Sequence, residues 1–288
     1  MKGIILAAGR GTRLYPMTKP VCKPLLPIYD KPMIFYPLSV LQKAGIREVL
    51  IITPPGETAP FERLFGDGAK LGMEISYLEQ PVQRGIADAF IIGADFIAGD
   101  RVCLILGDNV FYGDGLDDKL AQAASSPMNA VIFGYWVEDP RAFGVVEFDG
   151  EGRAVSIEEK PQSPRSNYIV PGLYFYTPDV VDIARTLTPS ARGELEITDV
   201  NNVYLRRGDL GVIPLDSGFT WLDAGTEDTL LESAQVIAEL ERNTGRCVAC
   251  VEEESFRRGW IDAAQLRKLG KELEKTRYGQ YILSAAER

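Results

Sequence analysis

The sequence predicts an α/β protein with a mixed, mostly parallel central sheet, helices on both faces, a small β insertion and C-terminal helices. Three observations support this prediction. Short, nearly continuous apolar runs are typical of strands that are buried on both faces. Amphipathic segments of helical length alternate with these runs. The 288 residues, of which 45% are hydrophobic, suffice for one large domain with an appendage.

The first half of the chain alternates strands and helices. We expect strands in the runs at 4–7, 49–52, 74–78, 102–106 and 130–136. Helices are expected between them at 32–44, 59–65, 86–96 and 116–124. Because a parallel pair of strands needs a long crossover, usually a helix, this order predicts parallel pairing. Ligands of such sheets bind beyond the carboxyl ends of the strands.

The second half of the chain changes character. Strands at 145–148 and 154–157 flank a turn rich in Gly and Asp, which predicts a β-hairpin. A strand at 168–176 is interrupted by Pro171-Gly172. The remaining elements are expected as helices at 179–187, 195–206, 226–242 and 262–269, with short strands at 212–215 and 220–222. Because no low-complexity linker precedes the tail, we expect it to pack on the core.

Composition excludes several classes of function. With 41 acidic and 31 basic residues, the chain lacks the basic excess typical of nucleic-acid-binding proteins. It contains no histidine, which excludes Ser-His-Asp and Cys-His catalysis and histidine metal ligands. No apolar stretch has the length of a signal peptide or a membrane span. We therefore expect a soluble, cytoplasmic protein with no nucleic-acid or membrane partner.

The four cysteines include a pair, Cys247 and Cys250, with C-x-x-C spacing. No second pair and no histidine completes a zinc site, and the pair lies far from any βαβ opening. We therefore expect ordinary reduced cysteines.

The first candidate site is the loop after the first strand. Small residues from Ala7 to Gly11 let the backbone approach a ligand, and Arg13 and Lys23 lie in the same connection. A strand that leads into such a loop, followed by cations, favours a polyphosphate site over a plain glycine-rich turn. It does not match the dinucleotide fingerprint, because Leu14 replaces the third glycine and the second strand ends in Thr53 rather than an acid. These two departures disfavour a dinucleotide-dependent oxidoreductase. The loop does not match the Walker A pattern either.

Two aspartates follow predicted strands directly. Asp108 follows the run at 102–106 and Asp223 follows the run at 220–222. Each could be a turn or helix-capping residue. Together, at the ligand-binding edge and beside an anion loop, they favour Mg²⁺, which binds one or two carboxylates plus substrate phosphates.

Three further residues are weaker candidates. Lys160 closes the second hairpin strand, where charged residues are usually only solvated, but a second phosphate-bearing substrate would need its own cation. Gln80 and Gly85 could read a base edge through an amide hydrogen bond and close backbone approach.

Residues Leu6 to Leu14, LAAGRGTRL, together with Lys23, resemble the signature of the sugar-1-phosphate nucleotidyltransferases. Further runs resemble the branch of this family that uses dTTP and glucose 1-phosphate. These runs are LLPIYDKPM at 25–33, LGDN at 106–109, FGVVEF at 143–148, EEKP at 158–161, GLYFY at 172–176, GELEITD at 193–199 and WLD at 221–223. With VAC at 248–250 and WIDAAQL at 260–266, the resemblance covers nearly the whole chain.

The resemblance implies a Rossmann-like nucleotidyltransferase fold and a Mg²⁺-assisted, in-line transfer of a thymidylyl group from dTTP to glucose 1-phosphate. The products would be dTDP-glucose and pyrophosphate, in the first step of dTDP-rhamnose and deoxysugar synthesis. Residues 1–240 would form the catalytic domain, with a nucleotide half over 1–110 and a sugar-phosphate half over 111–225. Residues 241–288 would form a helical extension. The resemblance also implies a homotetramer with a nucleotide-sugar allosteric site beside the C-terminal helices.

The resemblance assigns roles to matching residues. The catalytic residues would be Arg13, Lys23, Lys160, Asp108 and Asp223, and the last two would bind the metal. The nucleotide would contact Leu6, Ala7, Ala8, Gly9, Gly11, Thr12, Arg13, Lys23, Gln80, Gly85 and Asp108. The sugar phosphate would contact Asn109, Gly144, Glu159, Lys160, Val170 and Trp221.

Several departures from the pattern of the branch leave alternatives open. Pro24 stands where the branch has Gln, Arg84 where it has Asp, and Pro171 where it has Thr. The run AGTE at 224–227 replaces Thr-Gly-Thr-His. Because Pro24 and Pro171 lie beside predicted substrate contacts, a uridylyltransferase or an enzyme for another hexose 1-phosphate is the alternative. A non-catalytic nucleotide-sugar sensor is disfavoured, because no predicted metal ligand or key cation is missing.

Overall fold

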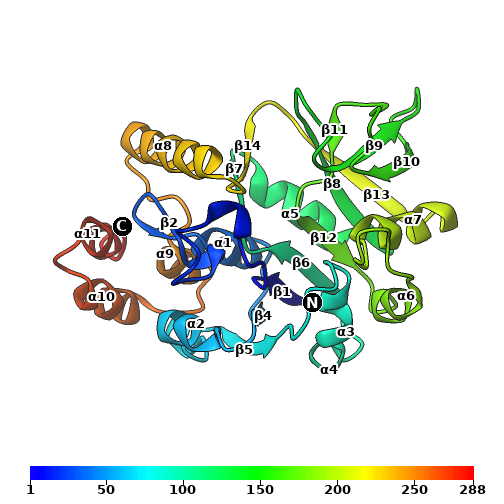
Figure 1. Ribbon diagram of the computed structural model, residues 1–288. Coiled ribbons are helices and arrows are strands. Elements are labelled where there is room, and N and C mark those ends of the chain that lie inside the picture. Colours follow the sequence, from blue (N-terminus) through cyan, green and yellow to red (C-terminus); the bar gives the residue numbers. More distant parts are fainter.

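One ten-stranded mixed sheet forms the centre of the molecule, and the computed structural model describes all 288 residues (Figure 1). Its strands are, in order across the sheet, β10 (Ala154–Glu159), β9 (Gly144–Phe148), β11 (Tyr168–Ile169), β8 (Ala130–Trp136), β12 (Leu173–Tyr176), β6 (Val102–Leu106), β1 (Lys2–Leu6), β4 (Glu48–Thr53) and β5 (Glu74–Glu79). The tenth strand, β13 (Leu210–Leu215), runs parallel to β8 outside this order.

The strand β1 lies between two parallel neighbours, β4 and β6, and β4 is also parallel to β5. Leu6, at the end of β1, is level with Ile52 of β4 and with Leu106 of β6. The carboxyl ends of these strands therefore meet at one edge, as the strand–helix alternation predicts. β12 lies antiparallel between β6 and β8, which makes the sheet mixed and confirms the predicted α/β class.

The predicted β-hairpin forms from β9 and β10 and continues the main sheet. Ile169 of β11 pairs with Val145 of β9, so β11 joins the hairpin to β8. The hairpin lies at the opposite end of the molecule from the C-terminal helices (Figure 1).

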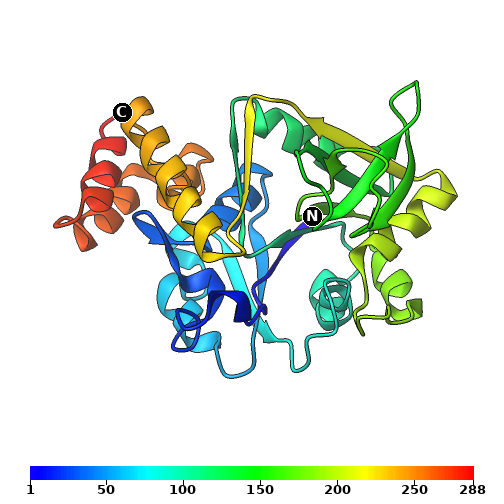
Figure 2. The same cartoon turned by 45° about the horizontal axis from the view of Figure 1, so that its top comes forward.

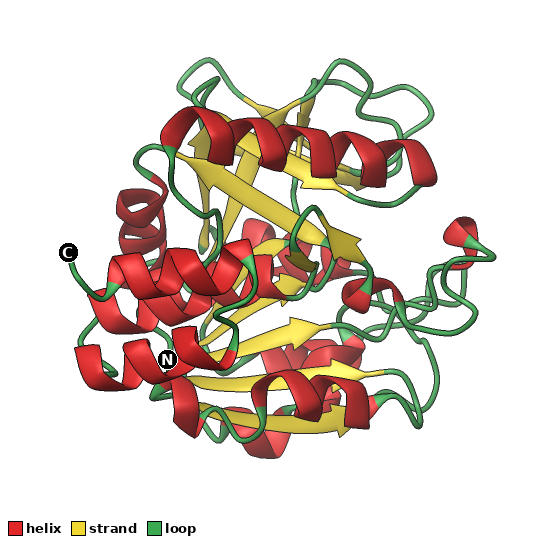
Figure 3. Cartoon of the chain, turned by 90° about the vertical axis from the view of Figure 1, so that its left-hand side faces the viewer, coloured by secondary structure: helices red, strands yellow, loops and turns green.

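Helices cover both faces of the sheet (Figure 3). They are α1 (Phe35–Lys43), α2 (Thr58–Phe65), α3 (Asp88–Ile92), α4 (Ala94–Ile97), α5 (Leu116–Ser125), α6 (Val180–Thr186), α7 (Ile197–Arg207), α8 (Glu227–Thr244), α9 (Val251–Arg257), α10 (Ala263–Glu272) and α11 (Arg277–Ala285). Successive residues of β1 point to opposite faces. Ile5 packs into the core under α1, α5 and α9, and Ile4 packs into the core under α3, α6 and α7. Both faces of β1 are thus apolar, which explains its unbroken hydrophobic run.

Some predicted elements differ from those observed. The helix expected at 86–96 is two short helices, α3 and α4, that meet at Gly93. A Cβ on Gly93 would lie 3.0 Å from Ile4 Cδ1, so this segment packs closely on β1 at the glycine. The strand expected at 168–176 is divided into β11 and β12, as Pro171-Gly172 suggested.

Other elements were not predicted individually, although the C-terminal segment as a whole was expected to be helical. They are the two-residue strands β2 (Pro27–Ile28) and β3 (Lys31–Pro32), the strand β7 (Asn109–Gly113), and the helices α9 and α11. β7 pairs antiparallel with β14 (Phe219–Asp223) in a separate two-stranded ladder.

The helix α8 connects the sheet to the C-terminal helices (Figure 2). It begins at Thr226, whose side chain accepts a hydrogen bond from Thr229 N in a capping box, and it ends at Gly245 in the left-handed conformation. α9 then packs on α1, where Gln42 Nε2 donates to Val251 O at 2.9 Å and to Ser255 Oγ at 2.8 Å. None of the helices combines the length with the apolar character that a membrane span requires.

Candidate functional site

A cavity of about 890 Å³ opens beyond the carboxyl end of β6. Predicted site residues from both halves of the chain line it. They are Arg13, Asp108, Asn109, Gly144, Glu159, Lys160, Val170, Trp221 and Asp223. The structure thus brings together every residue predicted for the sugar phosphate and the metal.

The remaining predicted nucleotide residues lie outside the lining of this cavity. Most of them form the loop after β1, where Thr12 to Leu14 make one turn of 3-10 helix. Leu14 is buried, and Arg13 lies beside Gly225 at the cavity wall. The chain here is held by Ala7 N, which donates to Ile52 O at 2.8 Å, and by Thr18 Oγ1, which donates to Gly11 O at 2.6 Å.

The two glycines of this loop are placed differently. Gly11 has a φ of 60°, and a Cβ on it would lie 3.0 Å from the side chains of Lys23 and Thr18. A Cβ on Gly9 would meet no atom within 4 Å. The backbone at Gly9 is therefore open to a ligand, whereas Gly11 is required by the turn itself.

Lys23 links the two predicted metal ligands. Its Nζ forms an ion pair with Asp108 and lies 3.7 Å from Asp223 Oδ1, and the residue is only 5% exposed. Asp223 is brought next to Asp108 by the ladder of β7 and β14, in which Asn109 pairs with Asp223. Asn109 Nδ2 also donates to Asp108 Oδ1 at 2.9 Å.

The two carboxylates have different electrostatic environments. Burial raises the pKa of Asp108, but the charge and hydrogen bond of Lys23 outweigh it and leave that pKa below its usual value. Burial and then the charge of Asp108 raise the pKa of Asp223, against the smaller effects of Lys23 and Arg13. Lys23 therefore pairs with both carboxylates, and its single positive charge does not fully compensate the negative charge of Asp223. Excess negative charge on two oxygen donors from neighbouring strands suits a divalent cation.

The far side of the cavity is built from buried hydrogen bonds. Asn109, which is 3% exposed, accepts from Trp221 Nε1 at 2.7 Å and from Gly172 N at 3.1 Å through its Oδ1. The Trp221 ring also packs edge-on against Phe143 at 5.2 Å. These contacts fix the indole at the cavity wall.

Glu159 and Lys160 face this cavity from the end of β10. Thr198 Oγ1 donates to Glu159 Oε2 at 2.6 Å, and Arg192 Nη2 donates to Glu159 Oε1 at 3.3 Å. Lys160 lies 3.9 Å from the same carboxylate, and its side chain is 47% exposed. A Cβ on Gly144 would lie 3.1 Å from Thr198 Oγ1, so the backbone approaches closely here. Lys160 is thus a cation that is free to meet an anionic ligand.

Gln80 and Gly85 do not line the large cavity. Gln80 Nε2 donates to the buried Asp88 at 3.0 Å, and Asp88 is paired with Arg84 at 2.6 Å. A Cβ on Gly85 would lie 2.5 Å from Leu195 O. Both residues therefore hold the loop after β5 in place. Their predicted contact with the nucleotide base stays a prediction.

Two contacts of the site were not predicted from the sequence. Gln83 Nε2 donates to Ala8 O at 2.6 Å and joins the loop after β5 to the loop after β1. Thr198 orients Glu159, and its only signal in the sequence is its place in the GELEITD run.

Known proteins resemble this chain over nearly its whole length. A family model described as nucleotidyl transferase matches residues 2–239. A glucose-1-phosphate thymidylyltransferase from Xanthomonas campestris pv. campestris (strain B100) is 54% identical over 287 residues, which cover 100% of this chain and 97% of the relative. The protein of the same name from Mycobacterium tuberculosis (strain ATCC 25618 / H37Rv) is 54% identical over 288 residues, with both chains fully covered.

Solved structures share the fold. A Bacillus anthracis protein, provisionally named a glucose-1-phosphate thymidylyltransferase and solved with a sucrose, superposes with a TM-score of 0.76 at 39% identity. The match covers 82% of this chain and 94% of that one. A UDP-glucose pyrophosphorylase complexed with UDP-glucose superposes with a TM-score of 0.74 at 25% identity, covering 83% and 98%. Since relatives of more than half identity extend over its whole length, the chain belongs to the nucleotidyl transferase family.

Proposed function

We propose that this protein is a glucose-1-phosphate thymidylyltransferase, which converts dTTP and glucose 1-phosphate to dTDP-glucose and pyrophosphate. The observation that supports it most is the arrangement of charge around one cavity. Arg13, Lys160 and the carboxylates of Asp108 and Asp223 all line it, and Lys23 pairs with both carboxylates. Full-length relatives of this name support the choice of substrates.

The attacking group needs no general base. A phosphate oxygen of glucose 1-phosphate is already ionised at neutral pH, which fits a chain without histidine. The oxygen attacks the α-phosphorus of dTTP, and pyrophosphate leaves in line. Catalysis therefore rests on positioning and charge neutralisation, and positioning of two reactants can supply roughly 7–11 kcal/mol.

Each cation has a defined role in this reaction. Lys160, at the sugar-phosphate side, holds the attacking phosphate. Arg13, at the glycine-rich loop, neutralises the charge that builds on the leaving pyrophosphate, and Lys23 supports the triphosphate while it orients Asp108. The exposed backbone at Gly9 lets the loop wrap the nucleotide closely.

We assign Asp108 and Asp223 as the ligands of Mg²⁺. They offer hard oxygen donors from adjacent strands, with more negative charge than Lys23 alone compensates. When bound there, Mg²⁺ would supply Lewis-acid neutralisation of phosphate oxygens.

A second candidate is a uridylyltransferase, which the similarity to the UDP-glucose pyrophosphorylase favours. The deciding experiment measures pyrophosphate release with glucose 1-phosphate and each of dTTP, UTP, CTP, ATP and GTP. The highest kcat/KM with dTTP supports the proposal, and a higher value with UTP supports the second candidate. Release with none of them would leave a non-catalytic nucleotide-sugar sensor. The Asp108→Asn variant, purified identically, reports any contaminating activity.

We extend the proposal to a cytoplasmic homotetramer that supplies dTDP-glucose for dTDP-rhamnose synthesis and binds a nucleotide sugar beside the C-terminal helices. The relatives of this name extend over the whole chain, including the C-terminal helices. Light scattering on the purified protein tests the tetramer. Binding of dTDP-sugars to a variant that lacks activity at the large cavity tests the second site.

A further inference from the structure

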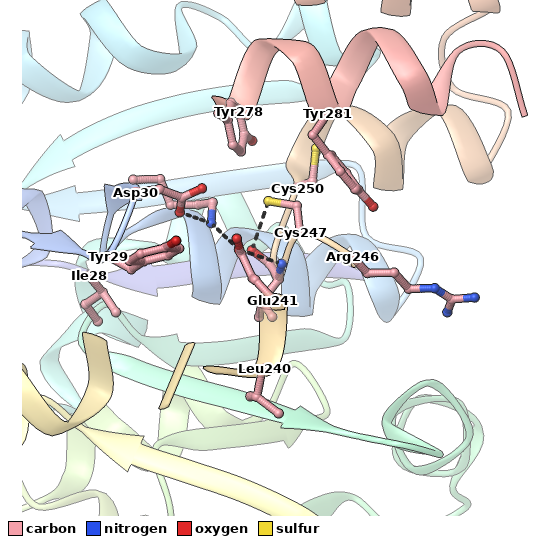
Figure 4. Close-up of polar contacts among 12 residues, drawn as sticks. Ile28, Tyr29, Asp30, Leu240, Glu241, Arg246, Cys247, Cys250, Tyr278 and Tyr281 are labelled. Carbon is pink, nitrogen blue, oxygen red and sulfur yellow. Dashed lines mark hydrogen bonds and ion pairs between the residues drawn. The ribbon is translucent and has the colours of Figure 1, made fainter. Parts of the chain in front are cut away.

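A second polar cluster lies where α8 ends (Figure 4), and none of its residues lines the large cavity. Lys31 Nζ donates to Asp30 Oδ1 at 2.5 Å and to Glu241 Oε1 at 3.3 Å. Val248 N donates to the same oxygen of Glu241 at 3.0 Å. Glu241 is 4% exposed. Through these two hydrogen bonds its buried carboxylate connects the β2–β3 turn to the chain that follows α8.

The chain after α8 makes a tight turn between two cysteines. Val248 and Ala249 are its central residues, and Cys247 and Cys250 are its first and last. Ala249 has a φ of 56°, the left-handed conformation that a type II turn requires at this position. The ends of a β-turn have Cα atoms less than about 7 Å apart, which overlaps the roughly 4.4–6.8 Å range found in disulfides. The two cysteines therefore lie at the ends of one turn, and the separations that such a turn allows overlap those that a disulfide spans.

The two thiols differ in access. Cys250 is buried, and burial followed by the neighbouring Cys247 thiol raises its pKa well above the usual value. Cys247 is partly exposed and lines a cavity of about 300 Å³ together with Arg246 and Arg277. Burial lowers the pKa of Lys31, but the neighbouring acidic groups raise it, so Lys31 is a cation and pairs with the carboxylates of Asp30 and Glu241 beside this cavity. Cys247 is therefore the thiol that a reagent in solution can reach, and Cys250 is the one that follows it.

A metal ion is a less suitable occupant of this cluster. Asp30, Glu241 and Cys247 each place one ligand atom within 4.8 Å of the others. Lys31 Nζ, however, already bonds both carboxylates from between them. A divalent cation would have to displace this buried ammonium, so the cysteines are better assigned to thiol chemistry.

We propose that Cys247 and Cys250 form a reversible intramolecular disulfide in the folded protein. The oxidant is a low-molecular-weight disulfide. The Cys247 thiolate attacks one sulfur of the reagent and releases its other half as a thiol. The Cys250 thiol then loses its proton to water, and its sulfur attacks Cys247 and releases the second half as a thiol. The protein is oxidised by two electrons, and the reagent is reduced to two thiols.

The experiment incubates the folded chain with oxidised glutathione, quenches it with acid, alkylates the remaining thiols and maps them by mass spectrometry. We expect the protein to lose two of its four free thiols, both in the peptide that holds Cys247 and Cys250, and to regain them with dithiothreitol. Cys22 and Cys103 are buried and serve as internal controls that stay alkylatable.

Single variants test the order of the steps. In Cys250→Ser, Cys247 should remain as a mixed disulfide with glutathione, because no second thiol resolves it. In Cys247→Ser, the buried Cys250 should stay reduced. Incubation of the urea-unfolded wild-type chain with the same reagent is the control that shows that the reagent can oxidise these cysteines. The proposal is overturned if the folded chain keeps four free thiols when the unfolded chain does not, or if wild-type Cys247 stops at the mixed disulfide.

Discussion

Substitution of the two loop glycines by alanine separates the stability of the loop from its contact with the nucleotide. At Gly11, alanine must adopt a φ near 60°, which costs a non-glycine residue about 1–2 kcal/mol. Its Cβ would also press on Lys23 and Thr18 at 3.0 Å, so we expect the free energy of unfolding to fall by at least this amount. For a chain of 288 residues that corresponds to a Tm lower by roughly 2–3 °C.

Gly9→Ala is the matched variant. Its Cβ meets no protein atom within 4 Å, and its φ is not in the left-handed region. We therefore expect Tm to stay within about 1 °C of the wild type or to rise slightly, because alanine restricts the unfolded chain. The KM for dTTP should nevertheless increase, since the methyl group occupies space that a closely wrapped nucleotide needs. The KM for glucose 1-phosphate should not change.

Thermal unfolding by calorimetry and pyrophosphate release with dTTP varied give both readouts. A Gly11→Ala protein as stable as the wild type would refute the conformational argument. An unchanged KM for dTTP in Gly9→Ala would refute the proposed close approach of the backbone.

Three further predictions concern the charged residues of the cavity. Asp223→Asn should nearly abolish pyrophosphate release, and substantial turnover would remove this residue from the metal site. Its Tm should stay the same or rise, because the raised pKa of the carboxyl means that folding disfavours its charge. Lys160→Ala should raise the KM for glucose 1-phosphate and leave that for dTTP unchanged, whereas equal shifts in both would contradict its assignment. Asp108→Asn should lower Tm at pH 7. The pKa of Asp108 is depressed on folding, so its stabilising effect is present above the ordinary value of 3.8 and is lost as the pH falls through the lower folded value. The Tm difference from wild type should therefore shrink in acid, and a constant difference from pH 7 to pH 3 would argue against the ion pair with Lys23.

The parts of the fold that follow from local sequence were predictable. β1, β4 and β6 are buried on both faces, so each is an unbroken apolar run that needs no knowledge of its partners. The β9–β10 hairpin is joined by a short turn of Gly and Asp, and its pairing is local.

The parts that depend on distant partners were not predictable. β7 is a strand only because β14, more than a hundred residues later, pairs with it, and its sequence begins with an Asn after a Gly-Asp turn. Gly93, where the helix is interrupted, packs closely on Ile4, a contact that the helical pattern of the sequence does not reveal. The residues that line the large cavity were expected to meet there, but the Gln83 contact with Ala8 depends on how two loops lie and left no pattern in the chain.

The ladder of β7 and β14 has a consequence for how activity is lost and regained. The pairing of Asn109 with Asp223 joins two chain segments that lie more than a hundred residues apart in the sequence. A chain cut in an exposed loop between these strands, such as the turn at Asp149 to Gly152, would place one aspartate on each piece. Neither fragment alone contains a complete pair, so neither should turn over substrate. Mixing the two pieces should restore activity only as fast as the strands re-pair, which makes turnover a direct measure of fragment reassembly.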